Sequence, residues 1–404
     1  MNQMNRIKLI VFIVVVFFFS MQNAFADFGV VLSEGFLAEH NEETDIANKL
    51  TLAPWLSLPL GNTDFYLSAG LSANYEEKLF FVPELFRAEL SYRTSIGNFL
   101  GFGLRLGRIK WQDLTRFTAI GTFDGAEVFT ELGSISLGAS VLYTGLQYKN
   151  TANINISPGD PKDYGATLDW KDFANTYFAP RRLLTSLYGD FPGFPSGRGN
   201  IQAGLMAQFD FSDAEEAFHT QYLLLRYTFY YKSIDLAAAG AMELENTDAD
   251  GFRAAYAFSA EGGWQTGLLV DRLSLGLRWA SGDGSASAPF FPVIREAQGI
   301  AFKPVFSGMM VIRANYQARL LPSFSAQLGG RYFIRTDSTS YIDPYIEHDS
   351  HLLGAEVDAT LLWLTFSDLS FSMSGGIFFP KTGSAMADNA PLRWAVNIGA
   401  IFSF

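Results

Sequence analysis

The chain has 404 residues, of which 49% are hydrophobic and 15% aromatic, while only 17% are charged. The aromatic content excludes a disordered chain, and the absence of cysteine excludes a disulfide scaffold. The net charge of -12 argues against nucleic acid as a partner, because phosphate binding requires a basic surface. After the N-terminus, no apolar run reaches the ~20 residues of a transmembrane helix. The apolar residues must therefore recur at a short period.

Residues 1–26 have the features of a cleaved secretory signal peptide. Arg6 and Lys8 supply its positive charge, Leu9 to Phe19 form its apolar core, and Ala24-Phe25-Ala26 is a cleavage motif. The alternative, a membrane anchor, is disfavoured because the apolar core is short for a span. We therefore expect an exported protein with one folded domain over residues 27–404.

Alternation of apolar with polar residues dominates that domain. Ile201 to Phe211 has apolar residues at every second position, with mainly Gln, Gly and Asp between them. Phe324 to Arg335, Leu369 to Ile377 and Leu392 to Phe404 have the same period. Alternation over such lengths predicts β-strands with one apolar and one polar face.

The predicted strands are about 10–14 residues long, which exceeds the ~6 of a typical soluble strand and suits a tilted transmembrane strand. The sequence thus predicts an all-β fold, a transmembrane antiparallel β-barrel of about 18 strands. The strands are expected to begin near Phe28, Ile46, Asp64, Glu84, Phe99, Phe123, Ile135, Arg182, Asn200, Thr220, Ile234, Phe252, Leu273, Phe306, Phe324, Leu352, Leu369 and Leu392.

The predicted connections alternate in length. Tight turns such as Gly61-Asn62 and Leu321-Pro322 follow even-numbered strands. Longer segments follow odd-numbered strands, at 40–44, 108–121, 149–181, 281–303 and 335–349. Outer-membrane barrels have short periplasmic turns and long external loops, whereas a soluble sandwich has no reason to segregate its loops. A closed barrel also pairs every backbone polar group, as hydrocarbon requires.

Arginines lie mainly within the predicted strands, on the polar face, whereas lysines lie mainly in loops and at strand ends. A charge that faces lipid at mid-depth costs about 2–4 kcal/mol, so these arginines are expected to point into the lumen. By parity, the inward basic set is Arg87, Arg93, Arg105, Arg226, Arg253, Arg278, Arg313, Arg319, Arg331, Arg335 and Arg393. The inward acids include Glu89, Asp210, Asp235, Glu243, Glu261, Glu356 and Asp358.

Two interpretations of this set remain open. Arg313 and Arg319 on one strand, with Arg331 and Arg335 on the next, form a predicted basic ladder. Arginine rings favour anions in a pore, and the guanidinium fork matches carboxylate or phosphate. Alternatively, the inward arginines and acids pair with one another and stiffen the wall without selecting a solute.

The two longest predicted loops bear on whether the lumen is open. Residues 150–180 either fold into the lumen as a constriction or lie outside as a lid. Residues 282–304 contain the apolar cluster Phe290-Phe291-Pro292, which is expected to pack over the mouth.

Motifs for catalysis or metal binding are weak. Residues 347–351 contain two histidines and two acids, but a solvated external loop is the favoured interpretation. No nucleophile elbow occurs, and His219 near Ser212 gives no geometry for a triad. We therefore expect no catalytic site, no metal and no cofactor, and the protein is not expected to be an enzyme.

Several short motifs resemble those of the alginate-export family of outer-membrane barrels. They are Leu106-Gly107-Arg108, Asp113 to Phe117, Phe123 to Ala126, Ala280 to Asp283, Phe290 to Pro292 with Gly299, Leu353 to Asp358 and Gly376 to Pro380. The resemblance implies a pore for an anionic polysaccharide, with Arg108, Asp113, Arg116, Glu356 and Asp358 in the lumen or at its mouth. Lys110-Trp111 departs from the family's usual Gln after Gly-Arg.

The chain end is similar to the assembly signal of outer-membrane barrels, with Phe402 and the terminal Phe404 on one face. This similarity implies outer-membrane lipid and the barrel assembly machinery as partners.

Together these features predict a porin-like outer-membrane channel for small anionic or saccharide solutes, and the resemblance adds export of an exopolysaccharide. The alternative is a structural or adhesive barrel with a closed lumen. The predicted solute path comprises Arg87, Arg93, Arg105, Arg108, Arg278, Arg313, Arg319, Arg331, Arg335, Glu356, Asp358 and Arg393. The sequence predicts no oligomeric state.

Overall fold

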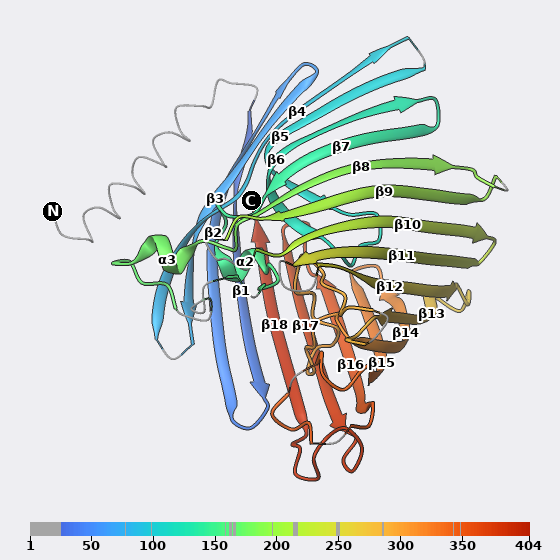
Figure 1. Cartoon of the computed structure of the whole chain (residues 1–404). Helices are drawn as coiled ribbons and strands as arrows, with labels where there is room; N and C mark the ends of the chain where they lie inside the picture. Colours follow the sequence, from blue (N-terminus) through green and yellow to red (C-terminus); the bar gives the residue numbers. More distant parts are fainter. Residues whose placement is uncertain are drawn as a thin grey trace.

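The computed structural model describes residues 26–404, apart from Glu77, Asn98, Pro158, 161–163, 165–166, Ser196, 213–216, 248–250, 285–286, Ile342 and His348. The predicted signal peptide, except for Ala26, therefore lies outside the described residues and stays a prediction. The described residues form 18 strands and two short helices (Figure 1): β1 (Asp27–His40), β2 (Thr44–Leu60), β3 (Thr63–Tyr75), β4 (Leu79–Ile96), β5 (Leu100–Gln112), β6 (Ile120–Leu132), β7 (Ile135–Tyr143), α2 (Lys149–Ala152), α3 (Phe173–Tyr177), β8 (Arg182–Pro192), β9 (Gly199–Asp210), β10 (His219–Tyr231), β11 (Ile234–Thr247), β12 (Gly251–Trp264), β13 (Val270–Ala280), β14 (Met309–Leu321), β15 (Phe324–Arg335), β16 (Leu352–Leu364), β17 (Leu369–Pro380) and β18 (Arg393–Ser403).

Each strand pairs antiparallel with the next strand along the chain, and β1 pairs with β18, so the sheet closes into a barrel. The predicted fold class, an antiparallel barrel of 18 strands, is confirmed. The largest difference in a strand start is at β4, which begins at Leu79 and not near Glu84. The four longest loops, 144–181, 281–308, 336–351 and 381–392, all follow odd-numbered strands, as alternating loop lengths predicted.

The two faces of the wall differ in chemistry. Outward positions hold large apolar side chains that are largely exposed, for example Leu205 on β9, Leu223 on β10 and Leu275 on β13. Most inward positions hold polar or small residues, as the period of two predicted, and the large apolar side chains among them pack against segments inside the barrel. In the described part of the chain, no helix is long and apolar enough to cross a membrane.

The buried core lies inside the barrel, between the wall and segments that fold inward. One cluster joins inward side chains of β10 to β13, such as Tyr222 and Ala257, to Phe290 and Phe306 of the loop 281–308. A second joins Phe333 and Phe378 on β15 and β17 to Phe302 of the same loop, whose ring stacks on Phe378 with centroids 4.2 Å apart. The expectation that residues 282–304 pack over the mouth is therefore wrong, because burial of these rings draws the loop into the lumen.

The β5–β6 hairpin also leaves the wall. β4 pairs with β5 only as far as Ala88–Arg108, and β6 pairs with β7 only as far as Asp124–Tyr143. Beyond those points β5 and β6 continue to pair with each other, so the hairpin tip at 109–123 has no wall neighbours. Gly107 stands at the bend with φ +103°, and a Cβ there would lie 2.1 Å from the Ala88 carbonyl oxygen. The tip carries Trp111 and Phe117 into the apolar cluster inside the barrel.

Candidate functional site

Three segments meet inside the barrel: the hairpin tip, the first part of loop 144–181, and loop 281–308. Backbone hydrogen bonds join them, from Val293 N to Thr118 O (2.8 Å), from Asn155 N to Val293 O (2.8 Å) and from Arg295 N to Asn153 O (2.8 Å). Residues 153–155 therefore lie in the lumen, which is the first of the two alternatives for residues 150–180. We call the meeting place of these three segments the constriction.

Residues of loop 144–181 on either side of 153–155 fill the space that the hairpin tip leaves in the wall. Tyr148 and Tyr177 pack on Val82 of β4, and the Tyr177 hydroxyl donates to the Pro83 carbonyl oxygen (2.7 Å). Burial raises the pKa of both tyrosines to about 12, so they stay protonated and able to donate at neutral pH.

Loop 281–308 is fixed to both sides of the barrel. On one side, Tyr222 Oη donates to the Phe291 carbonyl oxygen (2.7 Å), and the Phe291 amide donates to Glu243 (2.8 Å). On the other side, the Glu356 carboxylate accepts the amides of Ile300 (2.7 Å), Ala301 (3.1 Å) and Phe302 (2.7 Å). A further ion pair joins Lys303 of the loop to Glu39 on β1. The loop thus spans the lumen from β10–β11 to β16 and β1.

Asp113 holds the hairpin tip in shape. Its carboxylate accepts the amides of Thr115 (2.6 Å), Thr118 (3.1 Å) and Ala119 (2.6 Å). Burial raises the pKa of Asp113, and the hydrogen bonds from Ala119 and Thr115 oppose that shift. The Arg116 amide donates to the same carboxylate (3.1 Å), and Arg116 has a left-handed backbone (φ 64°) that leaves its side chain exposed.

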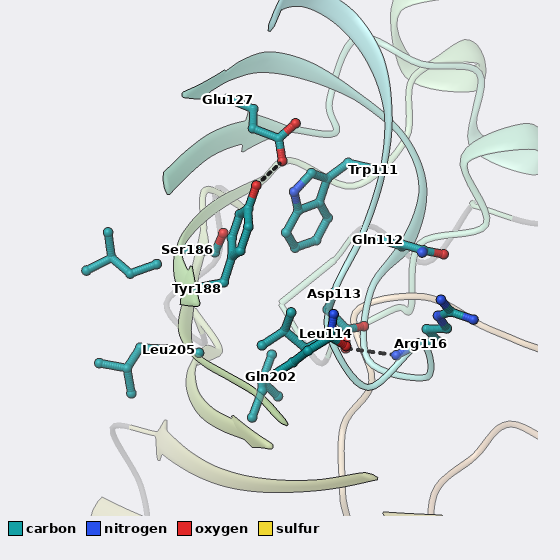
Figure 2. A pocket seen from close by; sticks show the side chains of 13 residues that line it. Trp111, Gln112, Asp113, Leu114, Arg116, Glu127, Ser186, Tyr188, Gln202 and Leu205 are labelled. Carbon is teal, nitrogen blue, oxygen red and sulfur yellow. Dashed lines mark hydrogen bonds between the residues drawn. The ribbon is translucent and has the colours of Figure 1, made fainter. Parts of the chain in front are cut away.

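A cavity of about 190 Å³ lies between the hairpin tip and the inner wall at β8 and β9. Trp111, Gln112 and Arg116 line it from the tip, and Tyr188 and Gln202 line it from the wall. Figure 2 shows Trp111 beside Tyr188, whose hydroxyl donates to Glu127 (3.0 Å). A second space, of about 410 Å³, is lined by Gly35, Lys49, Asn74, Ser372 and Asn397 on the opposite wall.

Most arginines of the predicted inward set lie in ion pairs. The pairs are Arg87–Glu89 (2.7 Å), Arg105–Glu89 (2.9 Å), Arg105–Glu127 (2.8 Å), Arg253–Asp283 (2.7 Å), Arg278–Glu296 (2.7 Å), Arg313–Glu261, Arg331–Glu356 (3.1 Å), Arg331–Asp358 and Arg393–Asp343 (2.8 Å). Burial alone raises the pKa of Asp343, but the Arg393 hydrogen bond and the Tyr345 amide outweigh burial and hold it below its ordinary value. The wall therefore contains the self-paired network that was one of the two open interpretations.

The predicted basic ladder is not continuous. Arg313 and Arg331 are direct neighbours across β14 and β15, but each one faces carboxylates. Arg319 is exposed at the end of β14 and donates to the Pro322 carbonyl oxygen (3.0 Å). Arg335 is 1% exposed and donates to the Ser350 carbonyl oxygen (2.8 Å).

Arg108 and Arg93 also lie away from the constriction. Arg108 is 6% exposed, pairs with Asp124 through two 2.7 Å contacts, and donates to the Leu85 carbonyl oxygen (2.6 Å). These contacts hold the bent hairpin against β4. Arg93 is exposed and lies over the Phe129 ring at 5.5 Å.

Three arginines at the constriction have no carboxylate within ion-pair distance among the described residues: Arg116, Arg226 and Arg295. Arg226 Nη1 on β10 reaches the Leu114 carbonyl oxygen (3.5 Å), two residues before Arg116. Arg295 lies on loop 281–308 and is exposed. The alternation predicted that Arg226 faces the lumen. It did not predict that Trp111, Tyr188 and Gln202 line one cavity at the hairpin tip.

No protein-family model and no curated protein sequence matches this chain. Solved structures do match. They include the outer membrane protein OprD of Pseudomonas aeruginosa (12% identity, TM-score 0.60, covering 94% of this chain and 93% of that one). OccK2 (OpdF) of the same organism has 14% identity and a TM-score of 0.59, covering 94% and 98% of the two chains, and it has also been solved in complex with glucuronate (TM-score 0.58).

These similarities correct the resemblance drawn from the sequence. The resemblance to the alginate-export family is wrong, because the matching solved structures are OprD and Occ proteins. The motifs behind it are short, and three of them lie within the strands β6, β16 and β17. The expectation of exopolysaccharide export depended on that resemblance, and it therefore has no support. At these identities, what the comparison establishes is the fold: this chain has the barrel fold of OprD and OccK2.

Proposed function

We propose that this protein is a porin-like channel of the outer membrane that passes small anionic solutes, acidic sugars among them. The observation that carries the proposal is the constriction, where Arg116, Arg226 and Arg295 carry positive charge without a described carboxylate partner. An outward apolar face with an inward polar face fits a barrel that has lipid outside and water inside. The fold is shared with OprD, an outer membrane protein, and with OccK2, which binds glucuronate in one structure.

The chemistry of the constriction suits a sugar carboxylate. The guanidinium of Arg116 offers a planar donor fork to a carboxylate. Gln202 offers an amide to hydroxyl groups, and the adjacent rings of Trp111 and Tyr188 offer an apolar face to a sugar ring. We therefore assign solute selectivity to the hairpin tip and not to the predicted ladder, because carboxylates already neutralise Arg313 and Arg331.

The test is ion selectivity of the purified protein in a planar bilayer. One unpaired charge about 4 Å from a passing ion changes the energy of that ion by about 1 kcal/mol in water. The change has opposite sign for anions and cations, so the anion-to-cation permeability ratio changes by about 2 kcal/mol, or roughly thirtyfold. Arg226→Gln and Arg116→Gln should each lower the anion-to-cation permeability ratio by about this factor. Arg198→Gln is the matched control, because it removes the same charge from a turn at the other end of the barrel, over the Tyr231 ring.

Two results would contradict the proposal. If the folded protein forms no conducting channel, the lumen is closed and the structural or adhesive alternative holds. If Arg198→Gln changes selectivity as much as Arg226→Gln, then net charge and not the constriction determines selectivity.

A further inference from the structure

One exposed charged side chain lies in the middle of the outward face, which is otherwise mainly apolar. The period of two in β1 places Glu39 inside, where it pairs with Lys303, so Glu34 lies outside. Glu34 is exposed and accepts a hydrogen bond from Asn48 of β2 (3.3 Å). In the described strands, the register places three other charged residues on this face. Arg108 and Asp124 pair with each other at the hairpin bend, and Asp271 is buried near the start of β13.

The register places this pair inside the apolar band. Glu34 stands opposite Ala400 of β18, two residues from Phe402 and six residues from Trp394, which are outward aromatic residues toward the two ends of β18. At about 3.3 Å per residue, Glu34 lies ~7 Å along the strand from the first ring and ~20 Å from the second. Glu34 thus lies within the outward apolar band, where hydrocarbon would leave its remaining acceptor sites without donors.

The surroundings have the form of a contact surface. Outward apolar side chains form a ring around the polar pair, and the small side chain of Ala400 leaves a shallow depression at its centre. The ring consists of Leu32, Phe36, Leu50, Leu52, Ile398 and Phe402. A polar centre enclosed by apolar side chains that exclude water is the arrangement of energetically important interface sites. β1, β2 and β18 lie next to one another in the wall (Figure 1).

We propose that the outward face of β1, β2 and β18 binds a second copy of this chain in the membrane. A two-fold axis along the membrane normal would bring Glu34 of each copy opposite Asn48 of the other, acceptor to donor, at one depth. Each carboxylate then gains a donor and each amide an acceptor, while the apolar ring seals the pair. The inference rests on the barrel spanning a membrane, as proposed above, and not on what passes through it.

The absence of cysteine makes the test direct, because each introduced thiol is unique. Leu50→Cys places a thiol beside Glu34, and Leu223→Cys places one at a comparably exposed outward position on β10 as the matched control. Intact outer membranes that contain either variant are treated with a short bifunctional maleimide. We expect a covalent dimer of this chain with Leu50→Cys and monomer with Leu223→Cys.

Two background changes then test the proposed contact. Glu34→Leu together with Asn48→Leu should lower the cross-linked fraction of Leu50→Cys by about tenfold. Ala400→Phe should do the same by filling the low centre while it leaves the polar pair intact. Heat-modified mobility on gels confirms that each variant folds, and both changes put apolar side chains against lipid, which barrels tolerate.

Three results would overturn the inference: equal cross-linking at the two positions, a cross-link that persists in both backgrounds, or an adduct whose mass is not twice that of the chain. Each can occur in a barrel that is recovered from the outer membrane and conducts normally, so failure here is distinguishable from failure of the proposed channel.

Discussion

Replacing Glu356 by alanine should release loop 281–308 from the β16 side of the barrel and widen the constriction. Its carboxylate accepts three consecutive loop amides, from Ile300, Ala301 and Phe302, and is 1% exposed. No described side chain other than Glu356 accepts these amides. The loop should then leave the wall there, since burial of unpaired amides is costly.

The size of the effect follows from the three hydrogen bonds that the substitution removes. A buried amide left without an acceptor costs about 1–3 kcal/mol. Because the three amides share one carboxylate, and coupled effects do not add fully, we take about 4 kcal/mol for the set. That energy changes the equilibrium between the docked and released loop by about a thousandfold, enough to make release observable.

Single-channel conductance and hydrogen exchange over residues 296–304 measure the release. Asp358→Ala is the matched control, because Asp358 pairs with the same Arg331 and lies two residues away on β16, but accepts none of the loop amides. Glu356→Ala should raise conductance and speed exchange in the loop, and Asp358→Ala should do neither. Unchanged conductance and protection in Glu356→Ala, or equal changes in both variants, would refute the reasoning.

Three further predictions concern stability. The pKa of Asp343 is lowered, so its ion pair with Arg393 stabilises the fold above about pH 4, and this contribution is lost as the pH falls through the lowered pKa. Arg393→Met should therefore reduce the fall in melting temperature that is measured as the pH decreases from about 6 to 2. Phe302→Ala should cost about 3–5 kcal/mol in urea unfolding, because it empties a fully enclosed site against Phe378; a loss below 1 kcal/mol would show that the loop is not docked. Gly107→Val should reduce the folded fraction on heat-modified gels, whereas Gly35→Ala, where a Cβ meets nothing within 4 Å, should not.

The sequence predicted the wall well because the wall obeys a local rule. Period-two alternation and turn spacing depend on neighbours in the chain, and 17 of the predicted strand starts lie within about three residues of those observed. β4 is the exception, since Pro83 interrupts the pattern where the strand continues to Leu79.

The interior was predicted less well because it depends on contacts between distant segments. Parity indicated that Arg313 and Arg331 face inward, but not that Glu261, Glu356 and Asp358 would neutralise them. The apolar residues of loop 281–308 were visible in the sequence, but only the matching apolar patches on β10 to β17 explain why they lie inside. The alternation of residues near Arg108 did not predict that the β5–β6 hairpin bends out of the wall.

That bend has a consequence for how the chain tolerates change. External loops of barrels usually accept insertions and deletions, because they connect strands that are already paired. Here residues 79–87 of β4 have no strand neighbour on one side, and a later segment completes the wall, with Tyr177 donating to the Pro83 carbonyl oxygen. Shortening loop 144–181 would therefore open a gap in the wall beside β4 and also alter the mouth of the barrel. The length of this loop is thus constrained as strictly as that of a strand.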